Sequence, residues 1–134
     1  MKTLFETEKL KITYEFERVF LIEKPSGKML LSDDFYGNPN CGLISVSNKW
    51  AIIGGEHLTV WKKINIPPTE KFIVEHFEWI HDMRLKSNNS IELLTDPWSE
   101  SSAVWELDIE TMTFMKIKDF KDYIGKAYCE QVEW

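Results

Sequence analysis

The side chains best suited to chemistry lie in the segment Gly54-Gly55-Glu56-His57, where an acid and an imidazole follow two glycines. Glycines allow a ligand to approach the backbone closely, and an imidazole can act as a general base. A phosphate-binding loop, however, requires a helix N-terminus directly after the glycines. A strand-like run begins instead at Leu58, so we interpret the segment as a hairpin turn whose glycines adopt positive φ.

Metal and nucleophile signatures are weak in this sequence. The three histidines show none of the HxH, HxxxH or HExxH spacings of zinc sites, and the GxSxG and SxxK motifs are missing. Cys41 and Cys129 are far apart, so we expect two reduced thiols, with Cys41 in the core. The sequence therefore predicts no catalytic residue, no metal and no cofactor.

Acidic residues beside aromatic ones are the remaining candidates. One group is Asp33, Asp34 and Tyr36, and Trp98 occupies a comparable acidic loop further along the chain. A second group, Glu106, Asp108 and Glu110, alternates with apolar residues and so shares one face of a strand. These acids form either a solvated strand face or a negatively charged docking surface with aromatic anchors for a basic protein.

Composition limits the classes of function. The 134 residues carry a net charge of −6, and 43% of them are apolar. Such a chain can bury a core, and its average field repels nucleic acid and anionic lipid. The N-terminus lacks the apolar core of a signal peptide and no long apolar run follows, so we expect a cytoplasmic protein without a membrane segment.

The elements that must position these residues are predicted to be strands. Residues 11–22 alternate apolar and polar side chains, and the turn formers of 24–28 follow them. Similar hairpin patterns recur later, which predicts an internal repeat of 11–64 and 72–117 in a single domain of 1–134. The predicted fold is mainly β: two similar antiparallel meander units of about four strands each, packed together.

Two segments depart from this simple pattern. Residues 71–80 fit both a helical and a strand period, and the repeat alignment favours the strand. Residues 119–131 show one apolar stripe after a capping Asp119, which predicts a C-terminal helix. We expect this helix to cover an open end or edge of the sheets.

Two resemblances add to these patterns. The WxLDxxT sequence that begins at Trp105 resembles the inner hairpins of β-propeller blades, which implies a bladed meander. The stretch DDFYGNPNCGLISVSNKWAIIGGEHLTVW of residues 33–61 resembles small bacterial immunity proteins of polymorphic toxin systems. That resemblance implies a cytoplasmic, non-catalytic protein that neutralises a cognate toxin by occluding it.

Two functions therefore stay open at this point. The first is a toxin-binding immunity protein that uses the acidic and aromatic residues named above. The second is a small enzyme or ligand-binding domain with a pocket between the two units near Trp50, Glu56 and His57. A buried His57 with a carboxylate partner and an adjoining pocket would favour the second function.

Overall fold

The described part of the chain folds into β-strands joined by turns and loops. The computed structural model describes residues 1–63, 70–74 and 76–134. Its strands are β1 (Lys2–Glu6), β2 (Leu10–Glu15), β3 (Arg18–Glu23), β4 (Met29–Asp34), β5 (Cys41–Ile44), β6 (Trp50–Gly54), β7 (Leu58–Lys62), β8 (Glu70–Val74), β9 (Ile80–Ser87), β10 (Ser90–Thr95), β11 (Ala103–Asp108) and β12 (Thr113–Asp119). Within each sheet, strands that follow one another in the sequence pair antiparallel, so the mainly β class is confirmed.

The strands form three meanders, and the prediction of two units was wrong. β1–β4, β5–β8 and β9–β12 each make a four-stranded sheet, and the sheets begin at residues 2, 41 and 80. The repeat is therefore 39 residues long, and the predicted unit 11–64 runs from β2 past β7 across two sheets. The predicted repeat matched the hairpin β3–β4 with the hairpin β9–β10. These hairpins are not equivalent, because β3–β4 ends the first sheet whereas β9–β10 begins the third.

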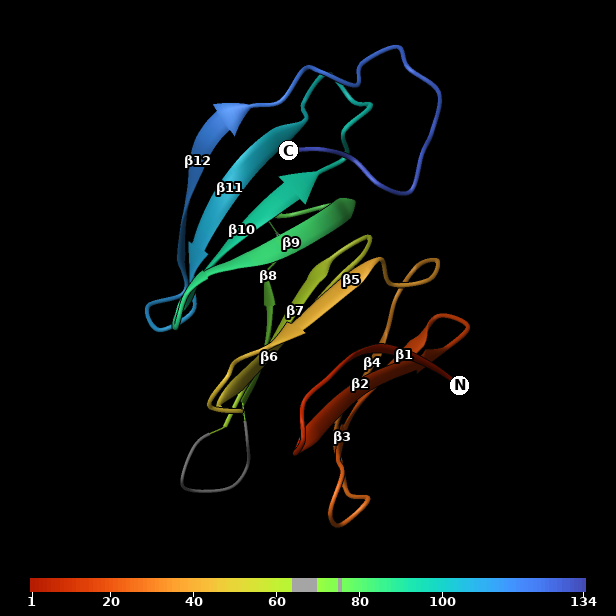
Figure 1. The fold of residues 1–134 in the computed structure, drawn as a ribbon, viewed down its shortest axis with the longest axis vertical. Helices are drawn as coiled ribbons and strands as arrows, with labels where there is room; N and C mark the ends of the chain where they lie inside the picture. The colour runs from red at the N-terminus through yellow and green to blue at the C-terminus, as the bar shows by residue number, and fades with distance from the viewer. Residues whose placement is uncertain (64–69, 75) are drawn as a thin grey trace.

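The three sheets are layered like blades, with the middle sheet between the other two (Figure 1). β5, the first strand of the middle sheet, contacts both β1 and β9, the first strands of its neighbours. The segment with the WxLDxxT pattern forms the last hairpin of the third sheet, β11–β12. The bladed meander that this pattern implied is present, with three sheets in place of two.

The middle sheet is buried on both faces, and its sequence reflects this. All five residues of β6 are buried, and their side chains alternate between two cores. Trp50 and Ile52 pack with the third sheet, whereas Ala51 and Ile53 pack with the first. A strand covered on both sides reads as a continuous apolar run, which explains the sequence WAII.

The C-terminal segment contains no helix, so the prediction of a helix at 119–131 was wrong. Asp119 is the last residue of β12, and the turns that follow end at Gly125, whose φ is +80°. A residue in this left-handed conformation stops helical growth. The segment instead crosses the third sheet, where Phe120 and Val132 join Leu94 in a small core. It therefore packs on the outer face of this sheet, whereas the predicted helix was expected to cover an open end or edge.

The ambiguous segment 71–80 is strand at both of its ends. Its first residues belong to β8 and Ile80 begins β9, while residues 76–79 connect the two and Trp79 has a φ of 54°. The strand prediction is thus confirmed except in the connection. The Pro67-Pro68 pair, which cannot continue a central strand and so predicts the boundary between the two units, lies outside the described residues.

Two predictions from composition concern thiols and membranes. Cys41 and Cys129 are both free thiols, and Cys41 is buried in the core as expected. Among the described residues, no helix has the length and apolar composition that crossing a membrane requires.

Candidate functional site

Gly54 ends β6 and Gly55 lies in the turn before β7. The prediction that this turn requires glycines because they adopt positive φ was wrong. Neither has a positive φ; the glycines that do are Gly27, Gly37 and Gly125. A Cβ on Gly54 would come within 2.9 Å of Ile80 Cγ2, and one on Gly55 within 2.9 Å of a Phe35 ring carbon. The glycine pair is therefore required for close packing against the neighbouring chain segments.

His57 lies at the centre of a closed polar cluster between the first and middle sheets. Its Nε2 is 3.0 Å from Asp33 Oδ2, and its Nδ1 bonds Glu56 Oε1. The ring stacks on Phe35 at 3.9 Å between centroids, and only 16% of the His57 side chain is exposed. Asp33 also accepts a hydrogen bond from Thr59 Oγ1. These five residues are called the His57 cluster below.

The electrostatics of this cluster favour the charged imidazole. Burial by itself lowers the pKa of His57, but the hydrogen bonds and charges of Asp33 and Glu56 outweigh it and raise the pKa above its usual value. The imidazolium can donate from both ring nitrogens, so it satisfies both carboxylates at once. His57 has no free lone pair in this state with which to accept a proton.

The predicted pocket around Trp50, Glu56 and His57 does not assemble. Trp50 begins β6, whereas Glu56 and His57 follow the other end of this strand. The indole of Trp50 donates to the Asn88 carbonyl at 3.0 Å, in the β9–β10 turn. Trp50, Glu56 and His57 line none of four well-formed hollows on the surface of the described residues. His57 is thus partly buried and has carboxylate partners, but it lines none of these hollows.

Other reactive groups are also held in structural roles. Burial raises the pKa of the Cys41 thiol, and the sulfur lies 3.9 Å from the Gly54 carbonyl. A neutral, buried thiol is a poor nucleophile. In the ranges that the structure describes, no group of three or more His, Cys, Asp and Glu side chains is placed to hold a metal ion.

The predicted docking acids are spread over two sheets. Asp33 belongs to the His57 cluster, and the neighbouring Asp34 pairs with Arg18 at 3.0 Å. In the third sheet, Glu106 accepts from Lys86 at 3.1 Å and from Ser90 at 2.9 Å, and these bonds lower the pKa of its carboxyl.

The remaining acids lie at the far end of β11. The Asp108 carboxylate accepts from the Thr111 amide at 3.0 Å in the β11–β12 turn, and Glu110 is exposed beyond the strand. Trp98 lies in the loop at the opposite end of β11. The structure therefore does not bring Glu106, Asp108 and Glu110 together with Trp98.

Three aromatic side chains line one hollow instead, and Tyr36 contacts one of them. Tyr36 contacts Trp79 at 6.3 Å between centroids, and Trp98 contacts Tyr128 at 4.9 Å. Trp79, Trp98 and Tyr128 line a hollow of about 250 Å³ together with Asp96. Tyr36 is 74% exposed, Trp79 49% and Tyr128 72%. We call this surface the aromatic groove.

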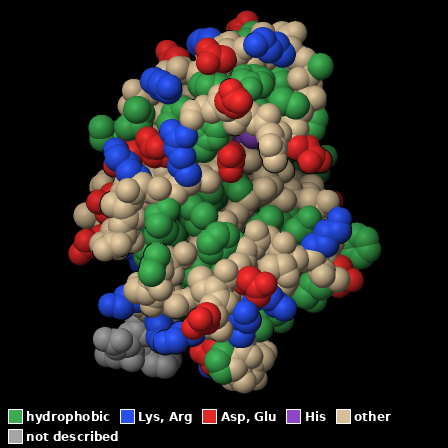
Figure 2. Space-filling view, viewed as in Figure 1, with side chains coloured by type: hydrophobic (Ala, Val, Ile, Leu, Met, Phe, Trp, Pro, Cys, Tyr) green, Lys and Arg blue, Asp and Glu red, His purple; other side chains and the backbone are tan. Residues whose placement is uncertain are grey.

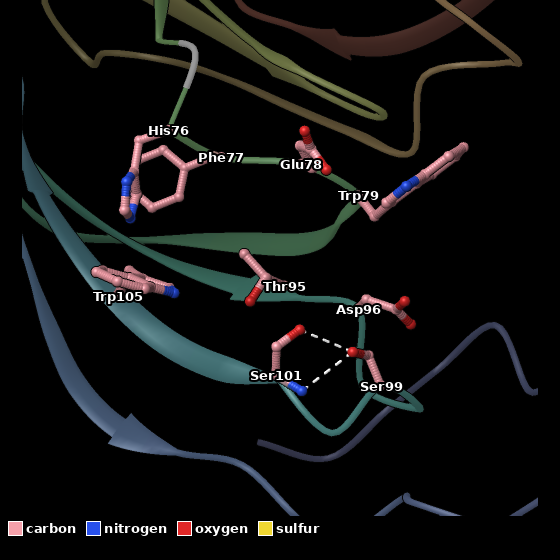
Figure 3. A pocket seen from close by; sticks show the side chains of 9 residues that line it. All are labelled: His76, Phe77, Glu78, Trp79, Thr95, Asp96, Ser99, Ser101 and Trp105. Atoms are coloured by element: carbon pink, nitrogen blue, oxygen red, sulfur yellow. Dashed lines mark hydrogen bonds between the residues drawn. The ribbon is translucent and has the colours of Figure 1, made fainter.

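A second hollow continues from the aromatic groove at Trp79 and Asp96, which line both. It measures about 280 Å³ and lies between residues 76–79, the β10–β11 loop and Trp105 (Figure 3). The charged side chains of its lining are Glu78 and Asp96. The face drawn in Figure 2 shows hydrophobic side chains reaching the surface in several patches separated by charged ones.

The sequence pointed to part of this surface. Tyr36 and Trp98 were selected as partner-binding residues, and both contribute to the aromatic groove. Trp79 was missed because it lies in the ambiguous segment 71–80, where the strand period gave no sign that the chain turns outward. In comparisons with known proteins, no family model and no curated protein matches this sequence.

Proposed function

We propose that this protein is a non-catalytic binding protein that neutralises a basic partner, a bacterial toxin, by occluding it. The observation that supports this most strongly is the aromatic groove, in which Tyr36, Trp79 and Tyr128 are left exposed side by side. Large aromatic residues are enriched at the energetic centres of protein interfaces, and exposing several together costs free energy that a bound partner recovers.

Charge supports a basic partner. The chain carries a net charge of −6. Neither hollow is lined by a lysine or arginine among the described residues, so the formal charges there are those of Glu78 and Asp96. A negative patch speeds encounter with a positive one and disfavours acidic partners.

The closed form of the His57 cluster supports a binding role over catalysis. A general base needs access to the proton that it removes. Both nitrogens of His57 face carboxylates, and the fully buried Thr59 donates its hydroxyl hydrogen bond to Asp33. These groups stabilise one another and leave none of them available to a substrate.

The test uses the protein encoded directly upstream of this chain. We expect its C-terminal domain to stop growth when expressed alone in a bacterial host, and co-expression of this protein to restore growth. The purified pair should form a complex by calorimetry, with affinity that falls as salt rises. Growth arrest that persists despite co-expression, with no complex at about 10 µM, would overturn the proposal.

A further inference from the structure

The hollow beside Trp105 has the shape and chemistry of a site for one extended side chain. Aromatic rings form one part of its lining: Phe77 and His76 lie 5.4 Å and 4.9 Å from Trp105 between ring centroids. Its mouth carries Asp96 and Glu78. Figure 3 shows Thr95 and Ser101 between the aromatic rings and the Asp96 side of the hollow. We call it the Trp105 pocket.

In the part of the chain that the structure describes, the carboxylates of this pocket have no lysine or arginine partner. Within the described residues no lysine or arginine pairs with Asp96 or Glu78. Lys116 on β12 lies 5.9 Å from the Trp105 ring centroid, but its ammonium is paired with Asp119 at 2.7 Å. Elsewhere on the same sheet, Glu92 and Glu106 each have a cation within 3.1 Å. Among the described residues, the acids of the Trp105 pocket therefore differ from Glu92 and Glu106 in having no paired lysine or arginine.

Some of the hydrogen-bond acceptors at the pocket are also unused. The Thr95 hydroxyl is taken up by the backbone of Ala103, at 3.3 Å to both its amide and its carbonyl. Ser99 and Ser101 bond each other at 2.8 Å, and Ser99 Oγ also accepts from the Ser101 amide at 3.0 Å. A hydroxyl oxygen has two lone pairs, so Ser101 can still accept a hydrogen bond, as can both oxygens of Asp96.

These features select a planar cation. Aromatic faces attract cations, and carboxylates bind a guanidinium through paired hydrogen bonds. Arginine combines a flat, stackable head with several donors, whereas the lysine ammonium is a strongly hydrated point charge. Because the pocket offers both an aromatic wall and separate acceptors at its mouth, we propose that it binds the side chain of an arginine from the basic partner. This inference rests on the proposed function and adds the identity of the anchoring group.

The test uses small probes, so that it does not depend on the partner. N-acetyl-arginine amide, N-acetyl-lysine amide and N-acetyl-citrulline amide are titrated into the full chain at low salt, and NMR follows the tryptophan indole signals. Trp105→Phe and Trp79→Phe variants assign these signals. We expect the arginine probe to bind about tenfold more tightly than its neutral citrulline isostere. It should also bind more tightly than the lysine probe.

The matched variants are Asp96→Asn and Asp122→Asn, which remove the same charge inside and outside the pocket. Asp96→Asn should abolish the preference for arginine over citrulline, while Asp122→Asn should preserve it. The Asp96 amide, not its carboxylate, bonds the Trp79 carbonyl at 2.8 Å, so Asp96→Asn leaves this backbone contact in place. Circular dichroism of both variants confirms that they are folded.

Each result separates this inference from the proposed function. Equal binding of the arginine and citrulline probes, equal binding of the lysine probe, or no saturable shift up to about 50 mM would overturn the arginine site. Any of these could occur while the protein still neutralises its toxin through the aromatic groove. Conversely, arginine-selective binding that is lost in Asp96→Asn would support the pocket even if the upstream protein is not the partner.

Discussion

The His57 cluster and the aromatic groove contain similar types of residue, but they differ in how far these residues are exposed. Both combine carboxylates with aromatic rings, and both lie where the loops of neighbouring sheets meet. In the His57 cluster every polar group has an internal partner, and the Phe35 ring is covered by the imidazole. In the aromatic groove, Asp96 has no basic partner among the described residues, and the ring of Trp79 is half exposed.

The two regions are also physically linked. The Glu56 carboxylate accepts from the Tyr36 amide at 3.3 Å, and its carbonyl accepts from the Trp79 amide at 3.2 Å. Glu56, which bonds His57, therefore also accepts hydrogen bonds from the backbone amides of Tyr36 and Trp79 in the aromatic groove. The difference between the regions teaches that satisfied polar groups stabilise the fold, while unsatisfied groups beside exposed rings are the ones available to a partner.

The largest effect is expected from His57→Leu. This change leaves Asp33 and Glu56, which are 9% and 28% exposed, without their shared cation. Breaking a mostly buried ion pair from one side costs about 3 kcal/mol of unfolding free energy. Urea denaturation measures this loss. His81→Leu is the control, because the His81 ring has one hydrogen bond, to the Glu130 carbonyl, and should lose about 1 kcal/mol or less. Equal losses in the two variants would refute the view that the His57 cluster is structural.

The next effect concerns binding, and it should spare stability. Trp79→Ala removes a half-exposed ring from the aromatic groove, so we expect binding to the toxin to weaken by about 2 kcal/mol. The urea midpoint should change little. Phe16→Ala is the matched control, because Phe16 is 82% exposed, has a similarly positive φ and lies outside the groove. Similar calorimetric affinities for both variants would exclude the groove as the interface.

Gly55→Ala tests whether space or backbone conformation requires the glycine. The added methyl would meet Phe35 at 2.9 Å and the Pro39 Cα at 3.3 Å, so we expect a loss of about 1 to 2 kcal/mol. Combining Gly55→Ala with Phe35→Leu should reduce the cost of the alanine, because the smaller side chain makes room. A double-mutant cycle by urea denaturation measures this coupling, and additive losses would show that the methyl does not act through Phe35.

The fold class could be predicted from the sequence, but the number of sheets could not. Alternation along residues 11–22 correctly predicts strand, and the turn formers at 24–28 correctly mark the β3–β4 turn. The structure, however, divides residues 11–22 into β2 and β3, with a turn at Phe16 and Glu17 that the alternation does not reveal. Every hairpin of a meander repeats this pattern, so the pattern cannot tell which strand begins a sheet. The 39-residue spacing of β1, β5 and β9 was the available signal. This spacing was obscured because the first strands differ in burial. Both β1 and β5 are edge strands, but β1 is largely exposed and β5 is largely buried, so their sequences do not look alike.

The candidate site was accessible only in part for a similar reason. Tyr36 and Trp98 stand out as aromatics beside acids, so the sequence selects them. Their shared neighbour Trp79 lies between β8 and β9, and its exposure depends on a local φ of 54° that no periodicity encodes. The same holds for the bond between His57 and Asp33, which joins residues from two sheets. Of the two carboxylates that bond His57, the sequence suggested only Glu56, which is adjacent to His57 in the chain.

The smallest effect is a pH dependence that separates the two regions. The pKa of His57 is raised in the folded state, so the stability that its charge supplies is fully present below the ordinary pKa of about 6.5. It is lost as pH rises through the folded pKa, because unfolding then releases a proton. We expect the unfolding free energy to fall between pH 6 and 8 by about 1 kcal/mol or less, within the limit of 1.4 kcal/mol per pH unit.

Staying below pH 8 avoids the buried thiol of Cys41, whose raised pKa removes stability only as pH rises beyond about 9. The groups that face His57 are Asp33 and Glu56, so His57→Gln should flatten the profile from pH 6 to 8. Trp79→Ala should leave the slope unchanged. If the slope survives in His57→Gln, another group is responsible, and the charge on His57 does not hold the first and middle sheets together.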